Sequence, residues 1–386
     1  MTAEIVIMNK NAVVMAADSI VTTIKDEWQK TYASANKLFA VSYNHSIGVM
    51  TYGIAGFINL PWETIIKSYR KERADKNTFD TVKSCVNDFI DYLESSDIFK
   101  KEDKEQFSIE IYKQFHLGIV NDISKHIENL ISENSEFNDY VEASKFIIGK
   151  ILELLETFPK PKQHDFENYI SYVSQNMEKI VEIEEIIYGK VYTSLIQDIE
   201  KLRQSYYNCI LLPLSSGIVF SGFGKNEYLP TTYSLNITEF RDSKLVYSIN
   251  DDDKYKGNCF IPFAQRSAID LFMTERSPRL MDTITDYLNN EVPENAEQII
   301  KKIDDVVQSY CSKKLEVLES FPVNELAFVA ENLVNLSSFQ MRLSRELETV
   351  GGPIDVAVIT KGDGFIWVRR KHYFKPELNP HFFEKQ

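Results

Sequence analysis

The second residue of the chain is a threonine, a residue that can act as a nucleophile and supply its own base. The chain begins Met1-Thr2-Ala3, and initiator methionine is normally trimmed before so small a residue. A threonine hydroxyl needs a base beside it, and the α-amino group of an N-terminal threonine can be that base. Such amino groups titrate at about 7.7–8.0, so part of the population is neutral at physiological pH. Because Met-Thr starts are common, this dipeptide alone does not establish the chemistry.

Two strand-like segments follow Thr2 and would fix its position. Residues 5–8 and 12–17 are apolar runs joined by the turn-type tripeptide Asn9-Lys10-Asn11. Both faces of these runs are apolar, which predicts a sheet that is covered on both sides. Further strands are expected at 37–42, 47–54, 217–224, 231–237, 245–249, 354–359 and 365–368.

Helical spacing dominates the rest of the chain. Apolar residues recur every three or four positions between about 61 and 205, and helices are also expected at 265–273, 296–318 and 324–346. Strands near both ends with helices between them predict an α+β fold, with two sheets packed together and helices outside.

Three blocks of the sequence form one pattern. The first runs from Thr2 to Ala16-Ala17-Asp18 and on through Ser19-Ile20-Val21-Thr22; the second comprises Lys37-Leu38-Phe39 and 47–56; the third is Gly351-Gly352-Pro353 to Thr360, followed by Lys361-Gly362-Asp363-Gly364. The pattern resembles the proteasome β-type subunits of the N-terminal nucleophile (Ntn) hydrolase superfamily, in their bacterial proteasome-like branch. The resemblance implies a four-layer αββα sandwich with a large helical insertion.

The resemblance assigns catalytic roles to four positions. It implies that Thr2 is the nucleophile, that Lys37 lies near its hydroxyl and lowers its proton affinity, and that Asp18 holds Lys37 in place. The backbone N–H of Gly53 would stabilise the oxyanion, and one such donor is worth about 3 kcal/mol. The implied reaction is acyl transfer to Thr2, giving an ester, followed by attack of water. No cofactor and no metal are implied.

The resemblance also places substrate-binding residues. Thr22 and the segment from Thr51 to Ala55 would hold an extended substrate backbone by strand addition, and Thr51 would face the first specificity pocket. Each of these residues has an ordinary alternative as a strand residue. Lys37 and Asp18 could likewise form a simple ion pair at a strand edge, and Gly53 could mark a bulge.

The chain departs from the family pattern in three places. The loop between Asp18 and Lys37 is slightly longer. The family has an aspartate and a serine before its final Gly-Gly, where they orient the terminal amine, whereas this chain has Leu347-Glu348-Thr349-Val350. Glu348 or Thr349 could substitute, although neither is in register. The Gly-Ser-Gly that precedes a helix in the family is replaced by 261–265.

We interpret residues 1–386 as a single hydrolase domain with two helical additions. The larger is an insertion at about 94–205, and the smaller is an extension at about 277–320. Additions of this size could cover a cleft, bind a partner or block ring assembly, and the sequence does not choose between these roles.

Composition excludes several classes of partner. The formal charge of −14 and the pI near 5.1 disfavour nucleic acid and anionic membranes, because phosphate binding needs a basic surface. No apolar run is long enough to span a bilayer, and no secretory signal is visible, so a cytoplasmic protein is expected. The four cysteines form no CxxC pair and the six histidines show no metal-ligand spacing.

The leading hypothesis is therefore a cytoplasmic threonine-type hydrolase that cleaves an amide, above all in peptides. Two alternatives stay open: an inactive proteasome-like scaffold or binding subunit, and an Ntn amidase that acts on a non-peptide amide. The resemblance implies a homo-oligomeric ring of six or seven copies, and the sequence does not tell whether an ATP-driven partner feeds it.

Overall fold

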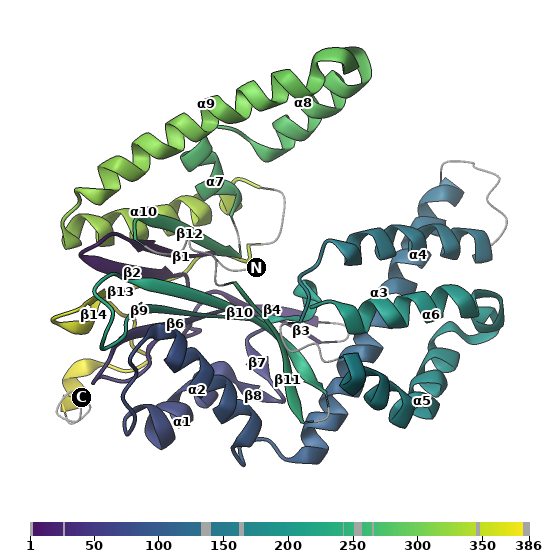
Figure 1. Ribbon diagram of the computed structural model, residues 1–386, viewed down its shortest axis with the longest axis horizontal. Coiled ribbons are helices and arrows are strands. Elements are labelled where there is room, and N and C mark those ends of the chain that lie inside the picture. The colour runs from purple at the N-terminus through teal and green to yellow at the C-terminus, as the bar shows by residue number, and fades with distance from the viewer. Residues whose placement is uncertain are drawn as a thin grey trace.

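A computed structural model describes residues 3–25, 28–132, 140–161, 166–241, 243–250, 257–264, 266–344 and 348–380. Two five-stranded sheets lie face to face at its centre, with helices on their outer sides and a helical region to one side (Figure 1). Thr2 lies outside the described residues.

The first sheet contains both ends of the fold. Its strand order is β12-β1-β2-β13-β14, and all its neighbours are antiparallel. The strands are β1 (Ala3–Met8), β2 (Ala12–Ala17), β12 (Cys259–Ala264), β13 (Asp355–Thr360) and β14 (Gly364–Arg369). Every residue of β1 and β2 is buried, as expected for a sheet covered on both faces.

The second sheet is also antiparallel. Its strand order is β11-β10-β9-β6-β5. The strands are β5 (Leu38–Ala40), β6 (Ser46–Gly53), β9 (Ser216–Phe223), β10 (Thr231–Arg241) and β11 (Lys244–Asn250).

Three layers of apolar side chains join these elements into a sandwich. Along β1, Val6 and Met8 pack between the two sheets, whereas Ile5 and Ile7 face the outer helix α10 (Val323–Arg342). The outer face of the second sheet is covered by α1 (Trp62–Tyr69) and α2 (Val82–Ser95). The order helix, sheet, sheet, helix confirms the expected α+β fold and its four-layer αββα arrangement.

The turn between β1 and β2 forms around Asn9, as its composition predicts. The Asn9 side-chain oxygen accepts hydrogen bonds from the backbone N–H groups of Asn11 (2.9 Å) and Ala12 (3.3 Å). Its amide nitrogen donates to the carbonyls of Leu318 (3.2 Å) and Phe321 (3.0 Å), which ties the turn to the outer helical layer.

Smaller elements surround the end of β6. The hairpin β3 (Val21–Lys25) and β4 (Trp28–Tyr32) stands apart from both sheets, and the short pair β7 (Gly56–Phe57) and β8 (Leu60–Pro61) leads into α1. A π-helical turn, η1 (Arg70–Ala74), follows α1.

The helical region consists of four long helices with short 3-10 turns. They are α3 (Lys101–Ser132), α4 (Tyr140–Glu156), α5 (Phe166–Tyr188), η2 (Gly189–Val191), α6 (Tyr192–Asn208) and η3 (Leu212–Leu214). These helices share an apolar core of their own. Contacts with β10 attach them to the sandwich: the Tyr206 hydroxyl donates to Glu239 (3.1 Å), and Arg241 donates to the Tyr207 carbonyl (2.8 Å).

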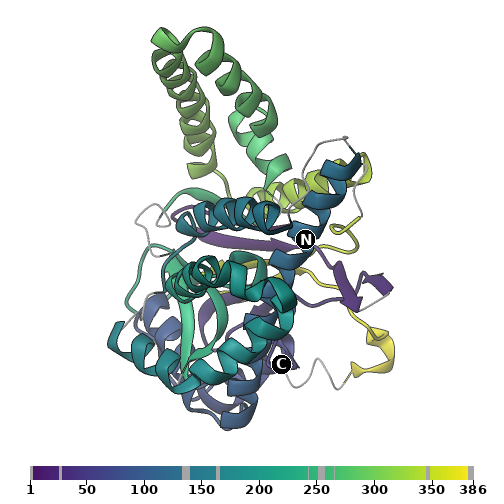
Figure 2. The ribbon, with the colours of Figure 1, turned by 90° about the vertical axis from the view of Figure 1, so that its right-hand side faces the viewer.

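The second helical addition is a hairpin that projects from the outer layer (Figures 1 and 2). Its helices are α8 (Pro278–Glu291) and α9 (Pro293–Glu319), and α7 (Ser267–Thr274) packs against both α9 and α10 at its base. A 3-10 turn, η5 (Pro376–Leu378), lies near the C-terminal end.

Three strand regions were not expected from the sequence: β12, the hairpin β3–β4 and the short pair β7–β8. Residues 259–264 form β12, although Pro262 interrupts the apolar pattern there; proline is tolerated because β12 is an edge strand. The hairpin β3–β4 was not expected because its sequence lacks the alternation of apolar and polar residues by which strands are recognised.

Candidate active site beside the N-terminal strand

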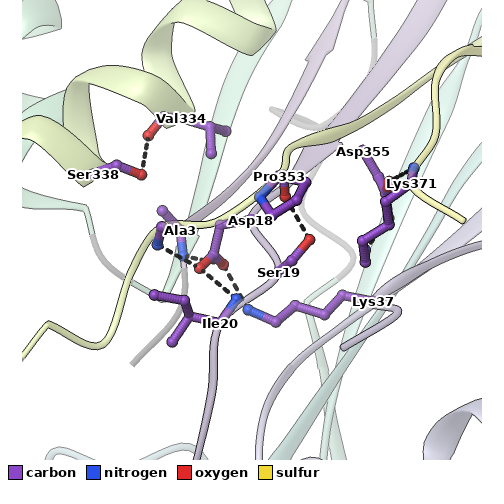
Figure 3. Close-up of polar contacts among 11 residues, drawn as sticks. Ala3, Asp18, Ser19, Ile20, Lys37, Val334, Ser338, Pro353, Asp355 and Lys371 are labelled. Carbon is purple, nitrogen blue, oxygen red and sulfur yellow. Dashed lines mark hydrogen bonds and ion pairs between the residues drawn. The ribbon is translucent and has the colours of Figure 1, made fainter. Parts of the chain in front are cut away.

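The Asp18 carboxylate joins segments that are far apart in the sequence. Asp18 follows β2 and is 1% exposed. Its Oδ1 accepts hydrogen bonds from the Ala3 backbone N–H (3.1 Å) and from the Lys37 Nζ (2.6 Å). Its Oδ2 accepts from the N–H groups of Ile20 (3.2 Å) and Gly351 (2.9 Å). Figure 3 shows how these groups converge on one side chain, directly beside the start of β1.

Lys37 is buried, and its charge is compensated at close range. The residue immediately precedes β5 and is 6% exposed, and its ammonium group forms an ion pair with Asp18. Its carbonyl accepts a hydrogen bond from the Thr51 N–H (2.9 Å), which fixes its backbone against β6. A buried ammonium group is costly unless it is paired, and Asp18 supplies that pairing.

The two glycines before β13 allow the chain to approach Asp18 closely. Gly352 has φ +76°, and a Cβ there would lie 2.9 Å from the Ala33 Cβ. The Gly351 carbonyl accepts from the Ser19 N–H (3.1 Å), while the Ser19 hydroxyl donates to the Pro353 carbonyl. A side chain at Gly352 would therefore be strained and would crowd the loop that follows Asp18.

Gly53 ends β6 in a conformation that favours glycine. Its φ is +76°, and a Cβ would lie 2.7 Å from the Ser215 carbonyl oxygen. The next residue is held to the same loop, because the Ser216 hydroxyl donates to the Ile54 carbonyl (3.0 Å). Both the positive φ and the close contact therefore favour glycine at the end of this strand.

A pocket of about 210 Å³ opens beside these residues. Lys37, Thr51, Gly53 and Ala55 line it, so the structure brings four of the predicted site residues around one cavity. The remaining lining residues are Val21, Ala35, Asn36, Tyr52, Ile54, Pro61, Trp62 and Glu63. Thr51 is buried on β6, whereas Ala55 is exposed at the rim.

Thr22 does not join this lining. It lies on β3 opposite Thr31, and its neighbour Val21 is the residue that lines the pocket. Its hydroxyl is buried without a hydrogen-bond partner among the described residues. A role of Thr22 in binding substrate stays a prediction.

The first described residue after the predicted nucleophile is Ala3. Thr2 is outside the described residues, but Ala3 pairs with Ala264 on one side, and its N–H is bound by Asp18 on the other. Ala264 has φ +59°, which is unusual for a residue with a side chain, and such strain is often found at functional sites. No local pattern of residues predicts this feature.

The residues before Gly351 do not reproduce the family arrangement. Glu348 is exposed, and Leu347 lies outside the described residues. The Thr349 hydroxyl is buried and has no hydrogen-bond partner among the described residues. Which group orients the terminal amine stays a prediction.

A second, larger cleft lies between the edges of the two sheets. It encloses about 540 Å³ between β10, β12 and the base of α7 and α9. Tyr52 lines both this cleft and the smaller pocket, and its hydroxyl lies 3.2 Å from that of Ser234 and donates to Asn236 (3.1 Å). Its ring stacks on Phe263, with centroids 5.4 Å apart.

The described part of the chain contains no cluster of three or more histidine, cysteine, aspartate or glutamate side chains placed to hold a metal ion. Within the same residues, no helix is both long enough and apolar enough to cross a membrane. Burial raises the pKa of the Cys259 thiol at the larger cleft to about 12, so this thiol stays protonated at neutral pH.

Comparison with known proteins identifies no family. No protein-family model matches the chain, and no curated protein matches it. Among solved structures, the chain is similar to the Anbu (Gly-1) mutant from Hyphomicrobium sp. strain MC1, at 11% sequence identity and a TM-score of 0.32. The match covers 100% of this chain and 94% of the other. A likeness of this size carries no argument about activity.

Proposed function

We propose that the chain is a threonine-type Ntn hydrolase that cleaves amide bonds, above all in peptides, through an acyl ester on Thr2 after removal of Met1. The observation that carries the proposal is the buried Lys37–Asp18 pair, whose carboxylate also binds the backbone N–H of Ala3. That N–H belongs to the residue that directly follows Thr2.

The proposed mechanism uses the amine and hydroxyl of Thr2, the Lys37 ammonium group and the Gly53 N–H. The neutral α-amino group of Thr2 removes the proton from its own hydroxyl, and the positive charge of Lys37 favours the ionised oxygen. The oxygen attacks the amide carbonyl, and the N–H of Gly53 stabilises the oxyanion. The protonated amine then gives its proton to the leaving nitrogen. Water attacks the ester to release the acid and restore Thr2.

The pocket supports an extended substrate. Thr51 and Gly53 lie on the same strand end, with Val21 opposite, so a substrate strand placed between them would bring one side chain into the pocket of about 210 Å³. A pocket of this size suits a single amino-acid side chain.

The test is hydrolysis of a panel of peptide amides and small non-peptide amides by the purified chain. The parent is expected to cleave peptide amides, and Thr2→Ala is expected to lose that activity. Thr157→Ala serves as the threonine-to-alanine control, because Thr157 is exposed after α4 and does not line the pocket. Equal hydrolysis by the parent and Thr2→Ala would overturn the proposal. Cleavage of small amides alone would assign the chain to the amidase alternative.

One observation favours an inactive scaffold as the second candidate. Glu348, which could take the place of the family's acid, is exposed. An inactive scaffold predicts no hydrolysis of any amide and no dependence of its binding properties on Lys37.

A further inference from the structure

The pocket beside Lys37 contains a second charged residue that the sequence analysis did not identify. Glu63 lies in the first turn of α1 and lines the pocket together with Asn36 and Trp62. The loop from Gly56 to Pro61 folds back after β6 and places this turn opposite Thr51. Thr51 and Glu63 therefore line the same pocket, although the β7–β8 pair lies between them in the sequence.

Glu63 and Lys37 are the charged residues of the lining, and they differ in how they are compensated. Asp18 neutralises Lys37 at 2.6 Å, with both side chains almost wholly buried. Glu63 pairs instead with Lys67 at 2.5 Å, and the side chains are 33% and 52% exposed. A pair this exposed contributes little and exchanges readily with other partners.

A neutral side chain, Asn36, holds the Glu63 carboxylate at the pocket. Asn36 donates a hydrogen bond from its Nδ2 to the Glu63 Oε1 (3.0 Å), and Asn36 is itself a lining residue. A cation that enters the pocket would meet a carboxylate that is already positioned, flanked by apolar surface from Trp62 and Val21.

We propose that Glu63 makes this pocket select a basic side chain, lysine or arginine, on the acyl side of the bond that is cleaved. The inference rests on the proposed function and concerns the same site. Lys67 competes for the same carboxylate, so it weakens the preference, and the substrate cation displaces it on binding.

The test compares matched substrates that differ at one residue. Peptide amides with lysine, norleucine, glutamate or glutamine at the acylated position are assayed, and the lysine-to-norleucine ratio of kcat/KM reports the preference. We expect lysine to be preferred by the parent, and the ratio to fall about twofold to fivefold in Glu63→Gln, the range for a partly exposed ion pair. In Glu63→Lys, glutamate should become preferred over glutamine.

Two further variants test the competition with Lys67. Lys67→Met removes the competing cation and is expected to raise the lysine-to-norleucine ratio above that of the parent. Glu72→Gln is the control: it makes the same change in charge at an exposed position of η1, the π-helical turn after α1. Its lysine-to-norleucine ratio should equal that of the parent.

The outcomes separate this inference from the proposed function. An unchanged ratio in Glu63→Gln, with hydrolysis of the norleucine substrate intact, overturns the role of Glu63 and leaves the hydrolase in place. Absence of hydrolysis of all four substrates by the parent overturns both. Thermal unfolding of each variant establishes that the protein assayed is folded.

Discussion

Two buried ion pairs in this molecule have the same nitrogen–oxygen distance but different surroundings. In the helical region, Glu184 and Arg203 meet at 2.6 Å; at the end of β2, Asp18 and Lys37 also meet at 2.6 Å. Arg203 donates from two nitrogens to both oxygens of Glu184, and Tyr112 and Tyr192 donate to the same carboxylate. This pair is enclosed by side chains of its own bundle.

The pair at Asp18 is arranged differently. Three backbone N–H groups from separate segments bind the carboxylate, whereas the described residues offer the Lys37 ammonium a single hydrogen-bond acceptor. Lys37 also lines a pocket, so its side chain borders space that a substrate can enter. Glu184–Arg203 is therefore expected to stabilise the fold, whereas the Asp18–Lys37 pair places a buried cation beside a pocket.

The largest expected effect is on catalysis. Lys37→Met should reduce amide hydrolysis by about a hundredfold to ten-thousandfold, because the cation that favours the ionised hydroxyl is lost. Hydrolysis of a fluorogenic peptide measures it. Lys10→Met is the matched control, since Lys10 forms an exposed pair with Glu319, and it should retain the parent rate. Parent-like activity in Lys37→Met would refute the role of Lys37.

The helical pair should affect stability instead. Arg203→Met leaves Glu184 buried without its cation and should lower the free energy of unfolding by about 3–5 kcal/mol. The double variant Glu184→Leu/Arg203→Met should recover part of that loss, as judged by urea unfolding, although Tyr112 and Tyr192 lose their acceptor. Lys201→Met removes an exposed pair with Asp198 and should cost less than about 1 kcal/mol. A double variant no more stable than Arg203→Met would contradict this account.

Gly53→Ala tests the strand end at the pocket. The new Cβ would press on the Ser215 carbonyl at a φ that favours glycine, so the backbone N–H should move and kcat should fall about tenfold or more. Gly362→Ala provides the comparison, because no atom lies within 4 Å of its added Cβ. Equal kcat values for the two variants would argue against a role for the Gly53 N–H.

The last prediction concerns pH and the helical region. Burial, with a smaller contribution from the charge of Arg203, lowers the pKa of His116 to about 3. Because the unfolded histidine titrates at about 6.5, the unfolded chain binds the extra proton between these values. His116 therefore makes stability fall with decreasing pH, by about 1.4 kcal/mol per pH unit over that window. His116→Gln should flatten the pH dependence of unfolding, and equal slopes in the parent and the variant would contradict the prediction.

Local pattern was sufficient to predict the central strands. The apolar runs of β1 and β2 and the turn at Asn9 are specified by neighbouring residues, and the structure confirms them. The edge strand β12 was not predicted, because Pro262 interrupts its run of apolar residues. Its pairing partner, β1, lies about 250 positions away in the sequence.

The site could be predicted only in part. Asp18, Lys37 and Gly53 follow from motif resemblance, and the structure places them together, but their catalytic roles stay predictions. Glu63 reaches the pocket only because the chain reverses between Gly56 and Pro61, which no local spacing encodes. The strained backbone at Ala264 likewise depends on the pairing of β12 with β1.

The central claim is that Thr2 carries a free amine and a reactive hydroxyl beside Lys37. Intact-mass measurement of the purified chain, before and after treatment with a threonine-directed electrophile, tests it most directly. We predict a chain that begins at Thr2 and gains one reagent, and a Thr2→Ala chain that gains none. A mature chain that retains Met1, or an adduct that persists in Thr2→Ala, would contradict it.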